Sequence, residues 1–244
     1  MKRLLLAGLA MMAAPHAGAG AGSWAYQGEH GPSHWADMDP GNQSCNGQEQ
    51  SPIDLNPSAI PASILPPAIY WRPADVTSAA NNGHTFQVSL DSPGRIVLDG
   101  KQYNFLQLHF HAGSEHTLNG YRYPLEVHLV HAADDGSLAV IGILFVEGQE
   151  NPALAQLIST LPGTQGAYDP NMVFDLKSLL PGDWSAYRYH GSLTTPPCSE
   201  IVSWTVFERP LTASRDQIAV FETLFPHSYR PLQAQGRRFV LKTN

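Results

Sequence analysis

The chain has 244 residues, of which 14 are basic and 21 acidic, so its formal net charge at neutral pH is −7. An acidic chain without basic runs is a poor partner for nucleic acid or for an anionic membrane surface, and we expect neither as a partner. The length allows a sizeable core, and we expect one domain over residues 22–244.

The first 21 residues have the pattern of a secretory signal peptide. Lys2 and Arg3 precede an apolar run from Leu4 to Ala14, and small residues follow, with cleavage expected near residues 19–21. The apolar run is too short to span a bilayer, so we expect no membrane anchor. Without Lys2 and Arg3 the net charge is −9. We therefore expect a periplasmic or secreted protein.

Cys45 and Cys198 are the only cysteines in the sequence. An exported protein can hold such a pair as a disulfide, because its compartment is oxidising. We favour that bridge over the alternative of two free thiols.

The predicted elements are mainly strands. Residues 24–67 are rich in Gly, Pro, Ser and Asn with little periodicity, and they predict an irregular segment over the core. Asp134-Asp135-Gly136 predicts a hairpin turn between two of the later strands. Short strand signals then lie at residues 84–90, 95–98, 103–111, 125–131, 138–146 and 201–207.

Helical signals are few and short. One helix begins at Asn151-Pro152, a second is expected over 174–180, and a third follows Ser214 and Gln217, which resemble a capping box. We therefore expect a mainly β, single-domain fold. It would be built on a large, twisted, mostly antiparallel central sheet of roughly ten strands, with short peripheral helices.

Three histidines on two predicted strands are the main functional signal. His109 and His111 are separated by one residue, so on a strand they point to the same face. His128 lies on the next long strand, and two adjacent strands can bring three imidazoles to one point. Gln107 and Glu126 share these faces and can accept the second ring N–H of a histidine. Three neutral imidazoles with an open fourth position predict a catalytic zinc site that makes hydroxide available near neutral pH.

Several sequence strings together resemble the α-class carbonic anhydrases. They are QLHFHAGSEH, LEVHLVH, GSLTTPPCSE and NNGHTF, and the similarity runs from Trp24 through HGPSHW and QSPI to the region near the C-terminus. The resemblance implies a zinc enzyme that interconverts CO2 and bicarbonate with water, by attack of zinc-bound hydroxide on CO2. It also implies inhibition by sulfonamides and small anions, and a monomer or homodimer.

The resemblance makes the three histidines the zinc ligands, with hydrogen-bond partners at Gln107 and Glu126. Thr194 would accept a hydrogen bond from the hydroxide and donate one to Glu115, since an ionised carboxylate can only accept. His84 would be the proton shuttle, because an imidazole at the cavity mouth titrates near neutral pH.

The resemblance also places the residues around the shuttle and the substrate. The water path would run near Tyr26, Asn82 and Gln87, where Gln87 replaces the Asn of well-studied animal members. The CO2 pocket would be lined by Val130, Val140, Leu193, Thr195 and Trp204.

Two features of the sequence differ from the animal members of this family and resemble the bacterial members. Ala112 stands where animal members carry Trp after the second ligand, and the segment from His111 to Glu115 is short. Cys198 follows the TTPP turn closely, so a bridge to Cys45 would tie the catalytic loop to the N-terminal segment.

Three alternatives differ in what they need from the sequence. A non-catalytic binding domain on the same fold would lack one or more ligand histidines, whereas all three are present with Glu115 and Thr194. A zinc-binding or buffering protein would need neither His84 nor an apolar wall. A zinc hydrolase that acts on esters could use the same hydroxide, and we expect this only as a side activity.

Overall fold

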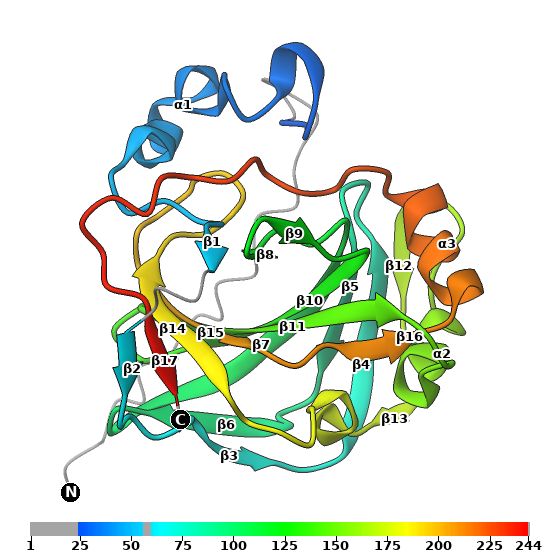
Figure 1. Cartoon of the computed structure of the whole chain (residues 1–244). Helices are drawn as coiled ribbons and strands as arrows, with labels where there is room; N and C mark the ends of the chain where they lie inside the picture. The colour runs from blue at the N-terminus through cyan, green and yellow to red at the C-terminus, as the bar shows by residue number, and fades with distance from the viewer. Residues whose placement is uncertain (1–23, 56–59, 244) are drawn as a thin grey trace, which may run out of the picture.

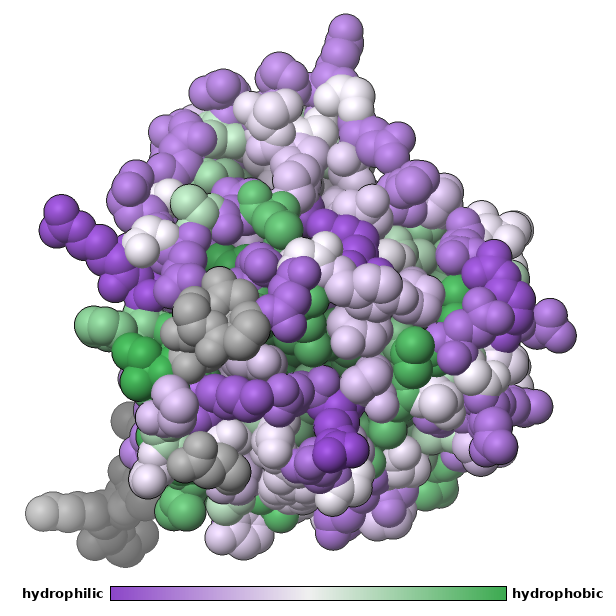
Figure 2. All heavy atoms as spheres, in the orientation of Figure 1, coloured by the Kyte–Doolittle hydropathy of each residue, from purple (hydrophilic) through white to green (hydrophobic). Residues whose placement is uncertain are grey.

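The computed structural model of the chain describes residues 24–55 and 60–243. The predicted signal peptide over residues 1–21 lies outside these described residues. The described part is mainly β, with a large mixed sheet and few, short helices (Figure 1). Within it, no helix is both long and apolar enough to cross a membrane. The face drawn in Figure 2 is mostly hydrophilic, with hydrophobic residues in separate patches.

The described residues form a few short helical segments and many strands. The helical segments are η1 (Gly28–His30), α1 (Trp35–Met38), η2 (Pro40–Asn46), α2 (Pro152–Ile158), η3 (Leu176–Leu179) and α3 (Arg215–Leu224). The strands are β1 (Asp54–Leu55), β2 (Ile60–Ala62), β3 (Ala68–Trp71), β4 (Ala74–Asn81), β5 (Phe86–Leu90), β6 (Gly94–Leu98), β7 (Lys101–Ala112), β8 (Thr117–Leu118), β9 (Tyr121–Arg122), β10 (Leu125–Ala132), β11 (Leu138–Glu147), β12 (Gly166–Tyr168), β13 (Val173–Phe174), β14 (Ala186–Gly191), β15 (Val202–Phe207), β16 (Leu211–Ala213) and β17 (Leu241–Thr243).

One 14-stranded sheet dominates the described residues. Its main path runs in the order β12-β4-β5-β7-β10-β11-β15-β14-β17-β2, and β3, β6, β13 and β16 join it off that path. Most neighbouring strands are antiparallel, whereas β11 pairs in parallel with β15 and β16, and β17 with β2. The expected mainly β fold is confirmed, and its sheet has more strands than the roughly ten expected.

The predicted helix over 174–180 is wrong. Phe174 belongs to β13, which pairs with β4, and only η3 turns as a short 3-10 helix. Its start is capped by the Asp175 carboxylate, which accepts the Lys177 N–H at 3.0 Å. Strands β4 and β14 were not predicted, because Ala, Ser and Asn in β4 and Arg and His in β14 weaken the strand signal.

Strands β10 and β11 form the hairpin that Asp134-Asp135-Gly136 predicts. The Ala133 N–H donates to the Ser137 carbonyl at 2.9 Å, and the Gly136 N–H donates to the Ala133 carbonyl at 3.0 Å. Gly136 has a φ of +84°, which a residue without Cβ adopts at no steric cost. The tight turn fixes the register of the two strands next to the candidate site.

Strands β7 and β10 bury two chemically different faces. On the apolar face, Leu108, Phe110 and Leu129 lie in a large hydrophobic cluster, which Leu154 of α2 and Phe221 of α3 complete. Because side chains alternate along a strand, the intervening residues point to the opposite face. That opposite face carries the polar groups and a second hydrophobic cluster.

A disulfide joins the N-terminal segment to the loop before β15. Cys45 in η2 is bonded to Cys198, with an S–S distance of 2.00 Å and a sequence separation of 153 residues. Both cysteines are buried in a cluster with Trp35. In a chain-entropy model a loop of this length contributes about 5 kcal/mol of stability. The bridge thus fastens η2 to the loop that contains Thr194.

Candidate metal centre

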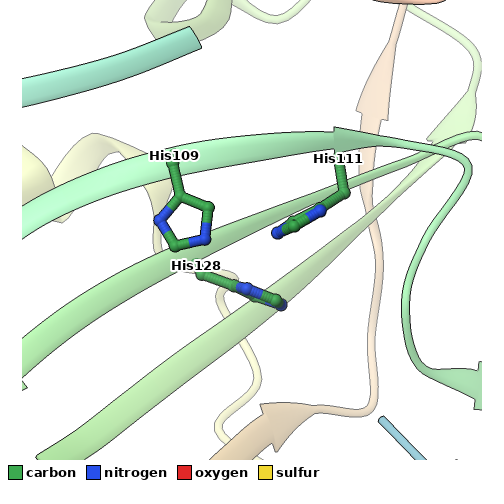
Figure 3. Close-up of side chains that lie close together, drawn as sticks. All are labelled: His109, His111 and His128. Carbon is green, nitrogen blue, oxygen red and sulfur yellow. The ribbon is translucent and has the colours of Figure 1, made fainter. Parts of the chain in front are cut away.

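Three histidine rings converge on the polar face of β7 and β10. His109 and His111 come from β7, and His128 comes from β10, directly opposite His109 in the antiparallel register. One ligand atom of each ring lies within 4.8 Å of the other two. Figure 3 shows the three rings pointing toward one another. His111 and His128 are each 1% exposed and His109 is partly exposed, so the cluster opens on the His109 side.

The second ring nitrogen of each histidine has its own acceptor. These contacts are Gln107 Oε1 at 2.9 Å from His109 Nδ1, the Ser228 carbonyl at 2.6 Å from His111 Nδ1, and Glu126 Oε1 at 2.8 Å from His128 Nε2. Each acceptor fixes an N–H on the nitrogen it contacts. The lone pairs that remain are on Nε2 of His109 and His111 and on Nδ1 of His128, toward the centre of the cluster.

The electrostatics favour uncharged imidazoles. Burial lowers the pKa of His109 well below its usual value, and the charges of His111 and His128 lower it further. Burial also lowers the pKa of His111, against an opposing effect of the Glu115 carboxylate. Histidine binds a metal in its neutral form. These two side chains are therefore in the ligand form at neutral pH.

Glu126 is the buried hydrogen-bond acceptor that orients His128. Its Oε1 accepts from His128 Nε2 and from His116 Nδ1, both at 2.8 Å. Its Oε2 accepts the backbone N–H groups of Glu115 at 2.8 Å and His116 at 2.9 Å. Burial alone would raise the pKa of Glu126, but His116 and His128 outweigh it and hold that pKa well below the usual value. The carboxylate is therefore ionised, and each of its two oxygens accepts two hydrogen bonds.

Glu115 lies buried beside the histidine cluster. Its Oε1 accepts the Arg230 backbone N–H at 2.9 Å, and its Oε2 lies 3.5 Å from His111 Nε2. That Oε2 has no hydrogen-bond partner among the described residues. Thr194 is 5% exposed in the loop after β14. The structure has no hydrogen bond between the Thr194 hydroxyl and Glu115, so that bond stays a prediction.

An apolar wall stands next to the histidines. Val130, Val140 and Trp204 are neighbours across β10, β11 and β15, and none is more than 6% exposed. Leu193 packs against the same cluster. The Trp204 ring centroid is 4.8 Å from that of His128. Four residues of the predicted CO2 pocket therefore gather beside the centre.

The remaining pocket residue lies at the disulfide end of the loop. Thr195 is partly exposed, and its carbonyl accepts the Cys198 N–H at 2.9 Å. The loop is thereby tied by its backbone as well as by the Cys45–Cys198 bond.

His84 lies in the turn between β4 and β5. Its ring stacks on Trp24, with ring centroids 3.8 Å apart, rather than on the histidine cluster. Both rings border a cavity of about 500 Å³ that Tyr26 and Ser228 also line. Burial lowers the pKa of His84, so its ring is mostly uncharged at neutral pH.

The predicted neighbours of His84 lie either in the same turn or near the histidine cluster. Asn82 Oδ1 accepts the backbone N–H groups of His84 and Thr85, both at 2.9 Å. Gln87 is partly exposed and lies opposite His109 in the β5–β7 register. The Tyr26 ring centroid is 6.5 Å from that of His111. Burial, with the charge of Glu115, raises the pKa of Tyr26 well above its usual value, so its hydroxyl stays protonated.

Three further residues shape the centre and were not predicted as part of it: His116, Ser228 and Arg230. His116 follows Glu115 in the same string as two of the histidines, which was an available signal. Ser228 and Arg230 lie more than 110 residues beyond the groups they contact. They act partly through backbone atoms, so their side-chain types carry no signal.

The donor set fits a zinc ion. His111 Nε2 is buried without a hydrogen-bond partner among the described residues, which is costly unless another group binds it. Zinc takes imidazole nitrogens at about 2.0–2.1 Å, and three histidines with a free fourth position are a known catalytic ligand set. Because none of the three ligands is charged, the ion would retain its full charge.

A second group with suitable spacing consists of His116, Glu126 and His128. Its donor atoms are already used: His116 Nδ1 contacts Glu126, and His116 Nε2 lies 2.7 Å from the Tyr189 hydroxyl. Both oxygens of Glu126 accept hydrogen bonds. This group supports His128 and offers no free ligand set.

Fold and centre together define a β-sheet protein with a three-histidine site of the type that catalytic zinc proteins use. A family model described as eukaryotic-type carbonic anhydrase matches residues 30–244. The chain therefore belongs to the α-carbonic anhydrase family, and it is a carbonic anhydrase enzyme.

Similar proteins and solved structures support this family assignment. The carbonic anhydrase of Pectobacterium carotovorum is 37% identical over 221 residues, which cover 89% of this chain and 90% of the relative. That of Klebsiella pneumoniae is 38% identical over 228 residues, with 91% and 92% covered. The α-carbonic anhydrase of Thermovibrio ammonificans, solved with the inhibitor sulfanilamide, has a TM-score of 0.87 and 41% identity. That match covers 91% of this chain and 100% of the other. These similarities support CO2 hydration as the activity.

Proposed function

We propose that the chain hydrates CO2 reversibly to bicarbonate and a proton at a zinc centre held by His109, His111 and His128. The observation that carries the proposal is the convergence of three imidazoles whose second nitrogens are all held by acceptors. Zinc bound by three uncharged ligands supplies the Lewis acidity that makes a nucleophile available near neutral pH.

The chain's first contribution is to orient the ligands before any metal binds. Gln107, Ser228 and Glu126 each fix one ring nitrogen and thereby aim the other toward the centre. Because the rings cannot reorient freely, binding costs little conformational entropy. The partly exposed edge of His109 leaves a side from which substrate and water enter.

The second contribution is a surface for an apolar substrate. We assign Val130, Val140, Leu193 and Trp204 to hold CO2, with Thr195 at the loop end of the pocket. Their support is the shared hydrophobic cluster and the short distance from Trp204 to His128. An apolar wall binds CO2 without competing hydrogen bonds, and it excludes water from that side.

The third contribution is orientation of the attacking water. We assign this role to Thr194, with its hydroxyl donating to Glu115 and its lone pairs available to the nucleophile. The unpartnered Oε2 of Glu115 is the acceptor that this arrangement needs. Since an ionised carboxylate only accepts, the direction of the hydrogen bonds would be fixed.

The fourth contribution is removal of the product proton by His84. Its lowered pKa leaves an uncharged ring at neutral pH, and the cavity beside it gives access to buffer. His84→Ala should slow turnover by about tenfold in dilute buffer, with recovery on addition of imidazole. The exposed His34, changed to Ala, provides the control. Equal rates for His84→Ala and wild type at every buffer concentration would rule out this assignment.

We also propose that the protein is exported to the periplasm or the medium. The Cys45–Cys198 disulfide and the pattern of the first 21 residues support export. N-terminal sequencing of the protein from its source should show removal of about the first 19–21 residues.

The function is tested by stopped-flow CO2 hydration on protein stripped of metal by a chelator and then given zinc. We expect no hydration above the uncatalysed rate after stripping and full recovery with one equivalent of zinc. A sulfonamide such as sulfanilamide should inhibit the restored protein. A full hydration rate in protein shown to be free of metal would contradict the proposal.

A further inference from the structure

The chain after α3 crosses the end of the polar face without helix or strand, and we term residues 226–231 the strap. Figure 1 shows the chain leaving α3 and running across the molecule at this point. The Ser228 carbonyl accepts from His111 Nδ1 at 2.6 Å, and the Ser228 hydroxyl accepts the Ala112 N–H at 2.8 Å. The Arg230 N–H donates to Glu115 Oε1 at 2.9 Å. The strap therefore fixes two groups of the centre.

Arg122 of β9 connects the strap to the turn that carries Glu115. Its guanidinium carbon lies 4.1 Å from the centroid of the Tyr229 ring, in the geometry of a cation–π contact. Its Nη1 donates to the Ser114 carbonyl and lies 3.4 Å from the Glu115 carbonyl. One side chain thus contacts both segments that support the centre.

Gly113 allows the Tyr229 ring to lie against the turn. A Cβ built at Gly113 would be 2.6 Å from Tyr229 Cε1 and 3.6 Å from Arg122 Cδ, and the φ of Gly113 is +74°. Only glycine satisfies both the contact and the backbone angle without strain. The turn, the ring and the guanidinium therefore meet at one point. Ala112 and the short turn after it lie beside that point, and both are features in which this sequence differs from the animal carbonic anhydrases.

We propose that Arg122 and Tyr229 form a clamp that positions His111 and Glu115 for zinc binding and CO2 hydration, an assignment that rests on the proposed function. The contacts of Arg122 and Tyr229 are with the turn and with each other, not with the free ligand nitrogens, so they are positioning residues. The clamp holds the strap at the distance where Ser228 orients His111 and Arg230 orients Glu115.

Loss of the clamp has a specific consequence. Without Arg122, Ser114 and Glu115 lose their carbonyl contacts and Tyr229 loses the cation that lies on it. His111 then loses a fixed Ser228 carbonyl, and Glu115 loses a fixed Arg230 N–H. Zinc should leave faster and the chemical step should slow, because hydrogen-bond partners of metal ligands typically change affinity or activity by about 10–100-fold.

The test compares Arg122→Leu with wild-type holoenzyme, by the rate of zinc transfer to a chelator and by kcat and KM for CO2. We expect zinc release at least about tenfold faster and a lower kcat, with KM changed less. Tyr229→Leu should give the same pattern, and the double variant should be no worse than either single variant. Arg122→Lys, which keeps a cation over the ring, should recover most of the loss.

Arg95→Leu is the matched control, because Arg95 also lies over a tyrosine, Tyr70, at 5.2 Å. Arg95 lies on β6, opposite Tyr70 of β3 and Asn104 of β7, and none of these residues belongs to the histidine cluster. Arg95→Leu should leave zinc release and kcat unchanged. Tyr229→Phe, which keeps the aromatic face under the guanidinium, should recover most of the loss seen in Tyr229→Leu.

A merely structural role makes a different prediction. If Arg122→Leu lowers only the unfolding temperature, and zinc release and kcat at 25 °C match wild type, the clamp assignment is overturned. If Arg122→Leu does not fold, Arg122→Gln removes the charge while keeping a donor for the Ser114 carbonyl, and wild-type zinc release in that variant would overturn it equally. Absence of zinc binding in the wild type itself would overturn the proposed function, and the clamp with it.

Discussion

His128 and His131 lie three residues apart on β10, and both are buried, yet they face opposite sides of the sheet. His128 Nε2 contacts the ionised Glu126 at 2.8 Å, and its other nitrogen points into the histidine cluster. His131 packs parallel to Trp71, with ring centroids 5.6 Å apart, and its Nδ1 contacts the Leu129 carbonyl at 3.0 Å. The comparison shows that burial and a hydrogen-bond acceptor behind the ring do not by themselves make a ligand; the further imidazoles in front of the His128 ring do.

The two faces of these strands should therefore respond differently to substitution. Changes on the polar face should affect the metal and turnover, and changes on the apolar face should affect stability. The register that creates this division pairs His109 with His128 and Val130 with Val140, and a one-residue shift would exchange the faces.

The largest effect on stability is expected from the apolar face. Leu129 is fully buried in the large hydrophobic cluster, so Leu129→Ala should lower the free energy of unfolding by about 3 kcal/mol. Urea unfolding measures that loss, and kcat/KM of the folded variant should stay near wild type. Val130→Ala, on the opposite face, should instead raise KM for CO2. A large loss of kcat/KM in folded Leu129→Ala protein would contradict the expected difference between the two faces.

His131 should make the protein sensitive to acid. Burial lowers its pKa from the ordinary 6.5 to about 4. Below pH 6.5 the His131 ring binds a proton more readily in the unfolded chain than in the folded one. The folded state therefore loses up to about 3 kcal/mol as the pH falls from 6.5 to 4, and none of this loss occurs above pH 6.5.

His131→Phe tests this pH dependence, because it keeps an aromatic ring against Trp71 and cannot titrate. Urea unfolding at several pH values should show a shallower loss between pH 6.5 and 4 than in wild type. Identical slopes for the two proteins would contradict the low pKa of His131.

A smaller effect on free energy is expected at the acceptor behind His128. In wild type, Glu126 accepts hydrogen bonds from four N–H donors, including the ring of His128. Glu126→Gln replaces one acceptor oxygen with an NH2 group, which cannot accept from them. Zinc affinity should therefore fall by about 10–100-fold. Competition with a chelator measures this change. Gln107→Ala should cost less, because Gln107 is partly exposed and supports one nitrogen. A larger loss for Gln107→Ala than for Glu126→Gln would reverse the expected order.

The sequence predicts the polar face well because strand alternation is a local rule. His109, His111 and Gln107 share a face through spacing alone, and the same rule places Glu126 beside His128. The Asp134-Asp135-Gly136 turn brings β11 next to β10 by equally local chemistry. The long strands β7, β10 and β11 were therefore predictable within a few residues.

Contacts made by backbone atoms at long range were not predictable. The Ser228 carbonyl behind His111 and the Arg230 N–H on Glu115 depend on the path of the strap, which has no periodic signal. The contact of Arg122 with Tyr229 likewise depends on the turn at Gly113. The 3-10 turn at 176–179 was mistaken for a helix because a single capped turn and a longer helix begin with the same residue types.

The central claim is that the three converging histidines form the zinc site that hydrates CO2. Zinc content and stopped-flow CO2 hydration, measured on the same samples of wild type and His109→Ala, test it most directly. We predict one zinc per wild-type chain with rapid hydration, and neither bound zinc nor hydration above background in the variant. Undiminished hydration by His109→Ala protein that contains no metal would contradict the account.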